Sequence, residues 1–438
     1  MRIWVVLCAV RIGGLAALGA PATKWLIVGG GPHGVHIAAR LLRVPGVGVG
    51  DLRIVDAGPA LLHRWKRRAA ATGMTYLRST SSSHVDVRED GLRRFAGRRD
   101  RSAFAPDYAR PRLDVFNAHA DRVVARDRLA AAHFRATVED VRPAGDLAAV
   151  AARTSAGGVE TLYAENVVLA LGDDRPAVPP WVDARALADG RVAHAFDAFD
   201  GDSAFPAAVA IVGGGVTAAH LALSAASTAG TTVDVLSRGG LPRERPFDVH
   251  PDWMMTGEAA ARSEAGGGAG RTERQRRFER LGVDARRAVI AAERVPGTAH
   301  AAVCRGARGV RYAIDAGRVR WHEAEVASMK LDDGGRCALS TSAGEFVVDE
   351  VRLATGFGKR VPGDGLVARI AAAFDLDVAP DGYPVPDATL RWSDSQIFVA
   401  GALAELELGP SARNLAGARL AAERIVAAAA AAAAGGVS

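Results

Sequence analysis

Two glycine-rich stretches of this chain follow the same local pattern. The first, Gly29–Gly34, comes directly after the apolar run Trp25–Val28. The second, Gly213–Ala218, comes directly after the apolar run Ala207–Val212. In both, a strand-like run ends at the glycines and a helix-like stretch follows, and glycines in such a turn let the backbone approach a pyrophosphate at the helix N-terminus. One motif of this kind is a weak signal, but two of them, about 180 residues apart, predict two bound dinucleotides.

Length and composition bound the class of protein. A chain of 438 residues is too long for one hydrophobic core, so two or three domains are expected. With 49% hydrophobic and 24% charged residues, the composition is that of a globular protein. The net charge of +6 is modest, and the densest basic runs, Arg64–Arg68 and Arg98–Arg101, lack an interleaved series of aromatic residues. We therefore expect solvated basic faces and no nucleic-acid partner.

The three cysteines, Cys8, Cys304 and Cys337, have neither CxxC spacing nor a spacing typical of metal ligands. This arrangement predicts no redox-active disulfide of the adjacent-cysteine type and no metal site. It also favours a reducing compartment.

The end of the second strand in each unit indicates which dinucleotide binds there. In the first unit this residue is Asp56, about 20 residues after the glycines, where a carboxylate can accept hydrogen bonds from ribose hydroxyls. In the second unit the strand ends in Ser237 and Arg238, with Arg243 and Arg245 shortly after. A carboxylate there would repel a 2′-phosphate, whereas guanidinium groups bind one. The sequence therefore predicts FAD at the first fingerprint and NADPH, rather than NADH, at the second. The alternatives are a turn aspartate in the first unit and an exposed basic loop in the second.

The predicted cofactor-binding residues fall into three groups along the chain. They are Gly29, Gly31, Gly34 and Asp56 at the first fingerprint, Gly213, Gly215, Thr217, Arg238 and Arg243 at the second, and Gly401 at the end of a C-terminal strand-like run. No catalytic side chain is predicted, because in flavin chemistry the cofactor carries the reaction while the protein orients the reactants.

The segments between the fingerprints indicate how the domains are connected. The strand-like run Asn166–Gly172 leads into a proline-rich linker, Arg175–Trp181, and the run Glu345–Leu353 leads into the turn Ala354–Gly356. We expect an α/β fold with two Rossmann-like, three-layer ββα dinucleotide-binding domains, the NADPH domain being inserted in the FAD domain. The predicted boundaries are 1–24 for an N-terminal extension, 25–180 and 354–426 for the FAD domain, 205–353 for the NADPH domain, and 427–438 for an Ala-rich tail.

Three local expectations follow from the same patterns. Helices are expected between Glu258 and Ala307, and strands from Val310 onward. A C-terminal helix is expected to begin near Gly409.

The order of these segments resembles that of flavoproteins that bind two dinucleotides. Within that class the chain most resembles the flavin-dependent N-hydroxylating monooxygenases of the lysine and ornithine hydroxylase type and their poorly characterised relatives. The stretches that carry the resemblance are Leu62–Trp65, Met74–Ser79, Tyr108–Pro111 and Ala354–Phe357. The resemblance implies an NADPH-dependent FAD monooxygenase in which a flavin hydroperoxide hydroxylates an amine or other soft nucleophile. It implies a small-molecule substrate and oxygen as partners, with Arg78, Tyr108 and Arg110 as candidate residues around the substrate.

Two other functions remain open from the sequence. One is an NAD(P)H-dependent flavoprotein reductase or oxidase that passes electrons to a quinone, a protein or oxygen. The other is a cofactor-binding protein without turnover, against which the two intact fingerprints argue. The sequence also leaves a homo-oligomer open.

The chain departs from its relatives in three places. Gly190 and His194 match part of a motif of the related Baeyer–Villiger and N/S-oxygenating enzymes, but the flanking aromatic positions differ, so His194 could equally be a linker histidine. Many two-dinucleotide flavoproteins have Gly-Asp where this chain has Gly401 and Ala402, so one ribityl hydrogen bond must come from elsewhere. The segment 405–414 is not the usual C-terminal signature of siderophore hydroxylases.

Residues 1–24 resemble a secretory leader, but Arg11 interrupts their apolar run and the first predicted strand begins at Trp25. A flavoprotein normally acquires its cofactor in the cytoplasm, and no twin-arginine export signal is present. We therefore expect a cytoplasmic protein with a non-functional extension or a misplaced start, and we expect no membrane span in the rest of the chain.

Overall fold

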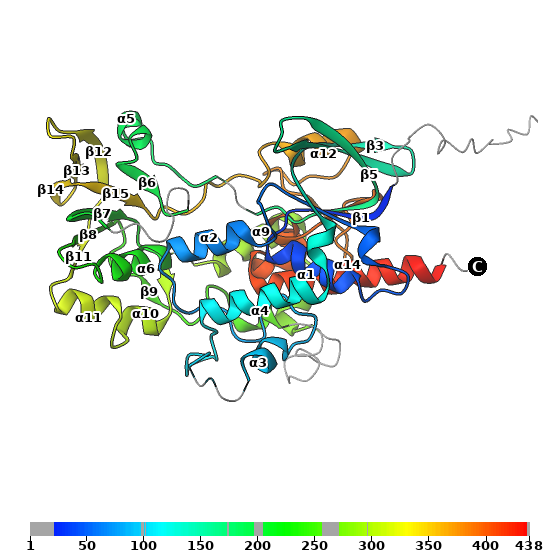
Figure 1. The fold of residues 1–438 in the computed structure, drawn as a ribbon, viewed down its shortest axis with the longest axis horizontal. Coiled ribbons are helices and arrows are strands. Elements are labelled where there is room, and N and C mark those ends of the chain that lie inside the picture. The colour runs from blue at the N-terminus through cyan, green and yellow to red at the C-terminus, as the bar shows by residue number, and fades with distance from the viewer. Residues whose placement is uncertain are drawn as a thin grey trace, which may run out of the picture.

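The computed structural model describes residues 22–435 apart from 98–99, 101, 173–174, 197–204, 256–270 and 296. Its two main sheets lie toward opposite ends of the long axis of the molecule, and helix α2 lies between them (Figure 1). Predictions that concern Cys8, most of the N-terminal extension and much of the second basic run fall outside the described residues.

The first sheet has six strands in the order β1-β2-β3-β4-β5-β16, with an additional pairing between β1 and β5. The strands are β1 (Thr23–Val28), β2 (Leu52–Asp56), β3 (His133–Ala144), β4 (Leu147–Thr154), β5 (Val159–Leu169) and β16 (Ile397–Val399). Strand β1 pairs in parallel with both β2 and β5, whereas β3, β4 and β5 form an antiparallel meander. The helices α1 (Pro32–Leu41) and α14 (Leu415–Gly435) lie side by side against this sheet (Figure 1).

The second sheet has five parallel strands in the order β11-β8-β7-β15-β6. The strands are β6 (Val192–His194), β7 (Ala208–Val212), β8 (Thr232–Ser237), β11 (Val319–Glu323) and β15 (Glu350–Leu353). A separate antiparallel sheet of β12 (Val326–Leu331), β13 (Cys337–Thr341) and β14 (Gly344–Val348) accompanies it, and β9 (Arg243–Glu244) pairs with β10 (Thr298–Ala299). Helix α6 (Val216–Ala225) follows β7 directly.

The remaining helices connect or cover the sheets. They are α2 (His63–Ala71), α3 (Gly91–Ala96), α4 (Leu113–Arg126), α5 (Ala184–Ala188), α8 (Glu273–Glu279), α9 (Val283–Glu293), α10 (Ala301–Arg305), α11 (Val310–Asp315), α12 (Leu366–Phe374) and α13 (Glu405–Leu408).

The central strands consist of continuous apolar runs because both of their faces are covered. In β1, Leu26 and Ile27 point to opposite faces and both are fully buried. In β7, Val209 and Ala210 likewise point to opposite faces and both are buried. The predicted α/β class with two Rossmann-like units is confirmed, and the second unit is inserted between β5 and β16 of the first.

Two local expectations were wrong. The segment from Val310 begins with helix α11, and the first strand after it is β11. The C-terminal helix begins at Leu415, because Gly409 has a φ of +78 and the following Pro410–Arg413 form a 3-10 turn. The Ala-rich tail continues this helix to Gly435.

Part of the predicted NADPH domain packs elsewhere. Phe278 of α8 and Ile290 of α9 share a buried cluster with Tyr383 and Leu406 of the returning chain. In the other direction, β6 precedes the predicted start of that domain at residue 205, yet pairs with β15 of the second sheet. The domain boundaries themselves stay a prediction.

Three findings concern the described residues alone. Cys304 and Cys337 are free and buried. No group of His, Cys, Asp or Glu among them could hold a metal ion. None of their helices is long and apolar enough to cross a membrane.

Candidate active site

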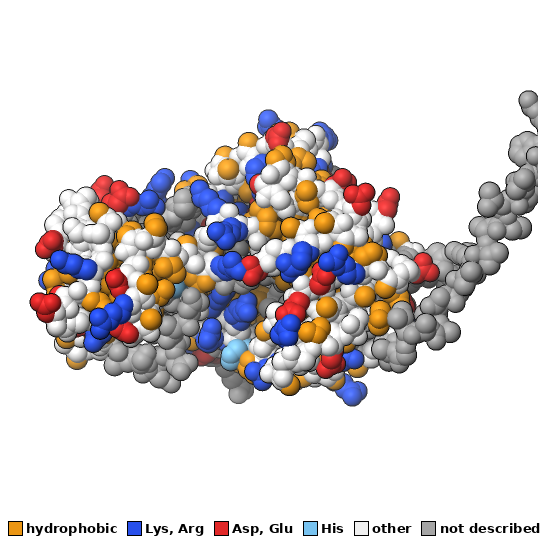
Figure 2. Space-filling model, turned by 90° about the horizontal axis from the view of Figure 1, so that it is seen from above, with side chains coloured by type: hydrophobic (Ala, Val, Ile, Leu, Met, Phe, Trp, Pro, Cys, Tyr) orange, Lys and Arg blue, Asp and Glu red, His pale blue; other side chains and the backbone are white. Residues whose placement is uncertain are grey.

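One cavity of about 1080 Å³ reaches from the first glycine-rich turn to the second. Gly29, Gly31 and Asp56 line it from the first unit, and Val216 and Thr217 from the second. Basic side chains gather along the boundary between the two parts of the molecule on the face shown in Figure 2. A concave site of this size between two units is the expected place for ligands.

The geometry of the first turn requires glycine. Gly29 has a φ of +113, and a Cβ on it would lie 2.5 Å from the carbonyl oxygen of Ala170. A Cβ on Gly34 would lie 1.9 Å from the oxygen of Gly29, so helix α1 packs directly on the turn. By contrast, a Cβ on Gly31 would meet no atom within 4 Å. The open space beside Gly31, at the N-terminus of α1, fits a pyrophosphate.

Asp56 ends β2 at the wall of this cavity. Its Oδ2 accepts a hydrogen bond of 2.8 Å from the Gly30 amide, and its Oδ1 accepts one of 2.8 Å from the Gly58 amide. These two bonds fix the carboxylate at the position predicted for a ribose-binding residue.

The second turn repeats the geometry of the first. Gly213 has a φ of +144, and a Cβ on it would lie 2.4 Å from the oxygen of Ala354, while a Cβ on Gly215 would again meet nothing within 4 Å. The position beside Gly214 differs, because Ser237 stands there where Asp56 stands beside Gly30. The Ser237 hydroxyl donates to the oxygen of Gly240. The second site therefore has a neutral side chain where the first has a carboxylate.

The two predicted phosphate-binding arginines lie apart from the cavity. The Arg238 side chain is 80% exposed and forms a loose ion pair with Glu325, at 3.8 Å between Nη1 and Oε1. Arg243 lies in β9 and lines a separate hollow of about 460 Å³ together with Arg305 and Arg311. Arg238 lies next to Ser237, which stands beside the second turn. Arg243 lines a hollow that is separate from the large cavity.

Gly401 and His33 meet at the cavity wall. Gly401 has a φ of +65, and a Cβ on it would lie 3.7 Å from Nδ1 of His33. This Nδ1 is buried and has no hydrogen-bond partner among the residues that the structure describes. Burial lowers the pKa of His33 to about 4, so the ring is neutral at neutral pH. His33 belongs to the first glycine-rich stretch, but nothing in the sequence indicated that its ring would lie beside Gly401 at the cavity wall.

The three residues that were expected to lie around the substrate have different surroundings. Arg78 lines the cavity, but it donates to the oxygen of Arg245 and to the Thr298 hydroxyl, at 3.1 Å each, and so ties the two units together. Arg110 also lines the cavity and is buried. Tyr108 is 52% exposed and packs edge-on against Phe247, outside the cavity wall.

A stacked group of side chains joins the two units beside the cavity. Phe196, which follows β6, stacks on Phe357 of the returning chain with ring centroids 5.1 Å apart and planes 7° apart. The Arg68 guanidinium of α2 lies 5.6 Å from the centre of the first ring and 5.2 Å from that of the second. The expectation that Arg64–Arg68 is a solvated face is therefore wrong for Arg68. His194 packs against Phe196 at 5.3 Å and does not line the large cavity.

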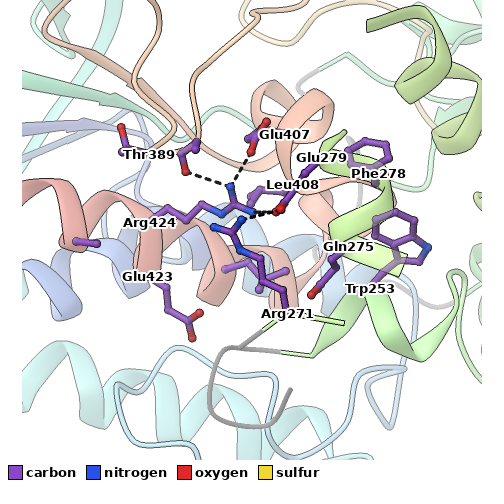
Figure 3. Close-up of a pocket in the computed structure, with 13 residues that line it drawn as sticks. Trp253, Arg271, Gln275, Phe278, Glu279, Thr389, Glu407, Leu408, Glu423 and Arg424 are labelled. Carbon is purple, nitrogen blue, oxygen red and sulfur yellow. Dashed lines mark hydrogen bonds and ion pairs between the residues drawn. The ribbon is translucent and has the colours of Figure 1, made fainter. Parts of the chain in front are cut away.

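A third hollow, of about 360 Å³, is lined by apolar residues such as Trp253 and Phe278 and by charged residues that pair with one another (Figure 3). Arg424 of α14 donates to Glu407 at 2.7 Å and to Glu279 at 2.9 Å. Next to this hollow, burial favours a raised pKa for Glu405, but the charges of Arg413 and Arg294 outweigh it and lower the pKa. The ion pair of Glu279 with Arg424 attaches α8 to α14, and the ion pair of Arg286 with Glu407 attaches α9 to α13.

The chain is similar in sequence and in fold to proteins that bind FAD and NAD(P). Two protein family models match parts of the chain. A model described as FAD-NAD(P)-binding matches residues 26–174, and one described as L-lysine 6-monooxygenase/L-ornithine 5-monooxygenase matches residues 121–242. No curated protein matches the sequence.

Solved structures share the fold at low sequence identity. The ornithine N-hydroxylase of Kutzneria sp. 744, solved with reduced FAD, NADP+ and L-ornithine, has a TM-score of 0.71 at 18% identity and covers 93% of this chain and 99% of its own. The ornithine hydroxylase of Pseudomonas aeruginosa has a TM-score of 0.72 at 17% identity, with 93% and 98% covered. The bacillithiol disulfide reductase of Bacillus cereus has a TM-score of 0.60 at 17% identity, with 94% and 99% covered. The resemblance to lysine and ornithine hydroxylases is thereby confirmed in a family model and in the fold.

Proposed function

We propose that this protein is an FAD- and NADPH-dependent monooxygenase that hydroxylates an amine or another soft nucleophile. The observation that carries the proposal is the single cavity that both glycine-rich turns enter, because it allows a nicotinamide and a flavin to meet. The match of residues 121–242 to the lysine and ornithine monooxygenase model supports the choice of an amine.

The proposed cofactor contacts follow from the two turns. Gly29, Gly31 and Gly34 would hold the FAD pyrophosphate at α1, with Asp56 on the ribose and Gly401 beside the ribityl chain. Gly213, Gly215 and Thr217 would hold the NADPH pyrophosphate at α6, with Arg238 and Arg243 as candidates for the 2′-phosphate. The buried Nδ1 of His33 is the candidate for the ribityl hydrogen bond that Ala402 cannot provide. FAD, when bound, supplies hydride acceptance and oxygen activation.

The chain itself would orient the reactants and exclude water. Helix α14 begins at Leu415, which lines the cavity, and the positive end of a helix of this length stabilises negative charge placed before it. Four carboxylates line the cavity: Asp56, Glu139, Asp248 and Asp364. Asp56 is held by backbone amides, and Glu139 and Asp364 pair with arginines.

Asp248 remains as the carboxylate for a substrate ammonium group: no ion pair joins it to another described residue, although the charge of Arg78 acts on it. It accepts a hydrogen bond from the Asn414 side chain at 3.3 Å, and both residues line the cavity. We therefore propose Asp248 as the residue that attracts the cationic end of the substrate. Removing its charge should raise the KM for the amine more than it lowers kcat.

A second candidate function is a flavoprotein reductase or oxidase, which the shared fold with a bacillithiol disulfide reductase favours. Among the described residues no cysteine lines the large cavity, so a thiol relay inside this chain has no support there. Electrons would then pass to an external acceptor or to oxygen.

One experiment separates the two functions. The purified protein is loaded with FAD and given NADPH, oxygen and one of three amines: ornithine, lysine or cadaverine. The hydroxylated amine and the peroxide are then measured against the NADPH consumed. Monooxygenation predicts that the hydroxylated amine accounts for most of the NADPH, and Asp248→Asn should lower this yield. Peroxide in full yield with every amine would refute it.

Further properties belong to the same proposal. The free cysteines Cys304 and Cys337 support a reducing compartment, and we propose a cytoplasmic location and a small-molecule substrate. We propose no metal and no nucleic-acid partner.

A further inference from the structure

We propose that Arg68 is a positioning residue for hydride transfer, which locks the second nucleotide-binding unit onto the first by packing over Phe196 and Phe357 together. The inference rests on the proposed function, because it concerns how two cofactors are held at the right separation. Arg68 belongs to the basic run that was predicted from the sequence to be a solvated face.

The three residues come from three separate parts of the fold. Arg68 belongs to α2 of the first unit, whereas Phe196 comes two residues after the end of β6 of the second sheet. Phe357 lies on the segment by which the chain returns to the first unit after β15. All three line the large cavity, so the contact lies where the two units face each other.

The geometry is that of a rigid contact. The two rings are nearly parallel, at 7°, and the guanidinium lies within 6 Å of both ring centres, at 5.6 Å and 5.2 Å. A cation over an aromatic face is attracted to the ring, and the attraction grows as the cation is desolvated. The planar guanidinium also stacks on rings in a way that an ammonium group does not.

The chain next to Phe357 is held by further bonds. The Ala177 amide donates to the oxygen of Gly356 at 2.9 Å, and Pro176 forms an isolated bridge with Phe357. The two segments that connect the units are thereby joined to each other. Arg68 adds a contact from α2, and so joins both segments to a helix of the first unit.

A charge-free variant tests the role in the holoenzyme. Arg68→Met keeps most of the side-chain volume, and we expect the rate of anaerobic flavin reduction at saturating NADPH to fall about tenfold to a hundredfold, because small errors in alignment cost this much. The affinity for FAD and the rate of chemical reduction by dithionite should not change. Arg67→Met, at an exposed position on the same helix, is the matched control and should behave like the wild type.

A second readout does not depend on turnover. In the flavin-free protein, the Ala177 amide should exchange its hydrogen for deuterium faster in Arg68→Met than in the wild type or Arg67→Met. Arg68→Lys keeps the charge and should recover part of both the exchange protection and the reduction rate.

The outcomes are distinguishable. A wild-type flavin that NADPH does not reduce would refute the proposed function. A reducible wild type with an equal rate in Arg68→Met would overturn the role of Arg68 alone. An equal loss of FAD affinity, thermal stability and rate, without recovery in Arg68→Lys, would make Arg68 a structural residue and overturn the inference as well.

Discussion

Replacing Arg238 by alanine should selectively weaken the use of NADPH. Arg238 follows Ser237, and Ser237 takes the place that Asp56 has in the first site, so no carboxylate opposes a 2′-phosphate next to Arg238. The variant removes the guanidinium and leaves the backbone of β8 intact. NADH lacks the 2′-phosphate and should be used as before.

The exposure of Arg238 sets the size of the effect. Two unit charges 4 Å apart attract each other by about 1 kcal/mol in bulk water and about 4 kcal/mol near a protein surface. With 80% of its side chain exposed, Arg238 belongs near the lower value for each charge, which gives about 2 kcal/mol against a 2′-phosphate with a charge of about −2. The ion pair of Arg238 with Glu325 must open first. Such an exposed pair costs about 0 to 1 kcal/mol to break. We expect a net loss of about 1 to 2 kcal/mol, which corresponds to about a fivefold to thirtyfold lower affinity.

The assay compares kcat/KM for NADPH and NADH in the wild type and in Arg238→Ala. The ratio of the two values should fall by about the same factor of five to thirty. Glu325→Gln is the matched control, and because it releases Arg238, it should keep or increase the NADPH preference. An unchanged ratio in Arg238→Ala would show that the phosphate is bound elsewhere, for example in the hollow that Arg243 lines.

Three further predictions concern FAD binding and stability. Gly34→Ala should abolish FAD retention, measured by flavin absorbance after gel filtration, because its Cβ would lie 1.9 Å from the oxygen of Gly29; flavin at wild-type occupancy would contradict this. Burial lowers the pKa of His84 from 6.5 to about 3, so between these pH values the unfolded chain binds the proton that the folded protein rejects. The free energy of unfolding should therefore fall as the pH drops below 6.5, and thermal melts of His84→Asn should show a shallower pH dependence; identical slopes would refute the assignment. Glu405→Gln removes the buried negative charge that pairs with Arg413, so the free energy of unfolding measured in urea should fall by about 3 to 5 kcal/mol. A midpoint of unfolding equal to that of the wild type would contradict this, because it would mean that water solvates the arginines in place of the carboxylate.

The sequence was sufficient for features that depend on local pattern. The runs Trp25–Val28 and Ala207–Val212 are apolar on both faces, so they could be identified as central strands, and the glycines that follow them mark the turns. The order of the segments then predicted the inserted second unit. Asp56 and Ser237 could also be compared from sequence alone, because each ends the second strand of its unit.

The features that the sequence did not predict depend mostly on contacts between residues that are far apart along the chain. Arg68 is 128 residues from Phe196 (196 − 68) and 289 from Phe357 (357 − 68), and no local pattern shows that these three side chains meet. The packing of Phe278 against Tyr383 has the same origin. The start of α14 at Leu415 was missed because Gly409 and Pro410 are equally compatible with a helix start and with a turn.

The central claim is that NADPH and FAD meet in one cavity and that electrons pass from the first to the second. Anaerobic stopped-flow mixing of the FAD-loaded protein with NADPH tests this claim most directly. We expect the oxidised-flavin absorbance to be lost, and to be lost faster with NADPH than with NADH at equal concentration. A flavin that stays oxidised with both nucleotides, although it is reduced by dithionite, would contradict it.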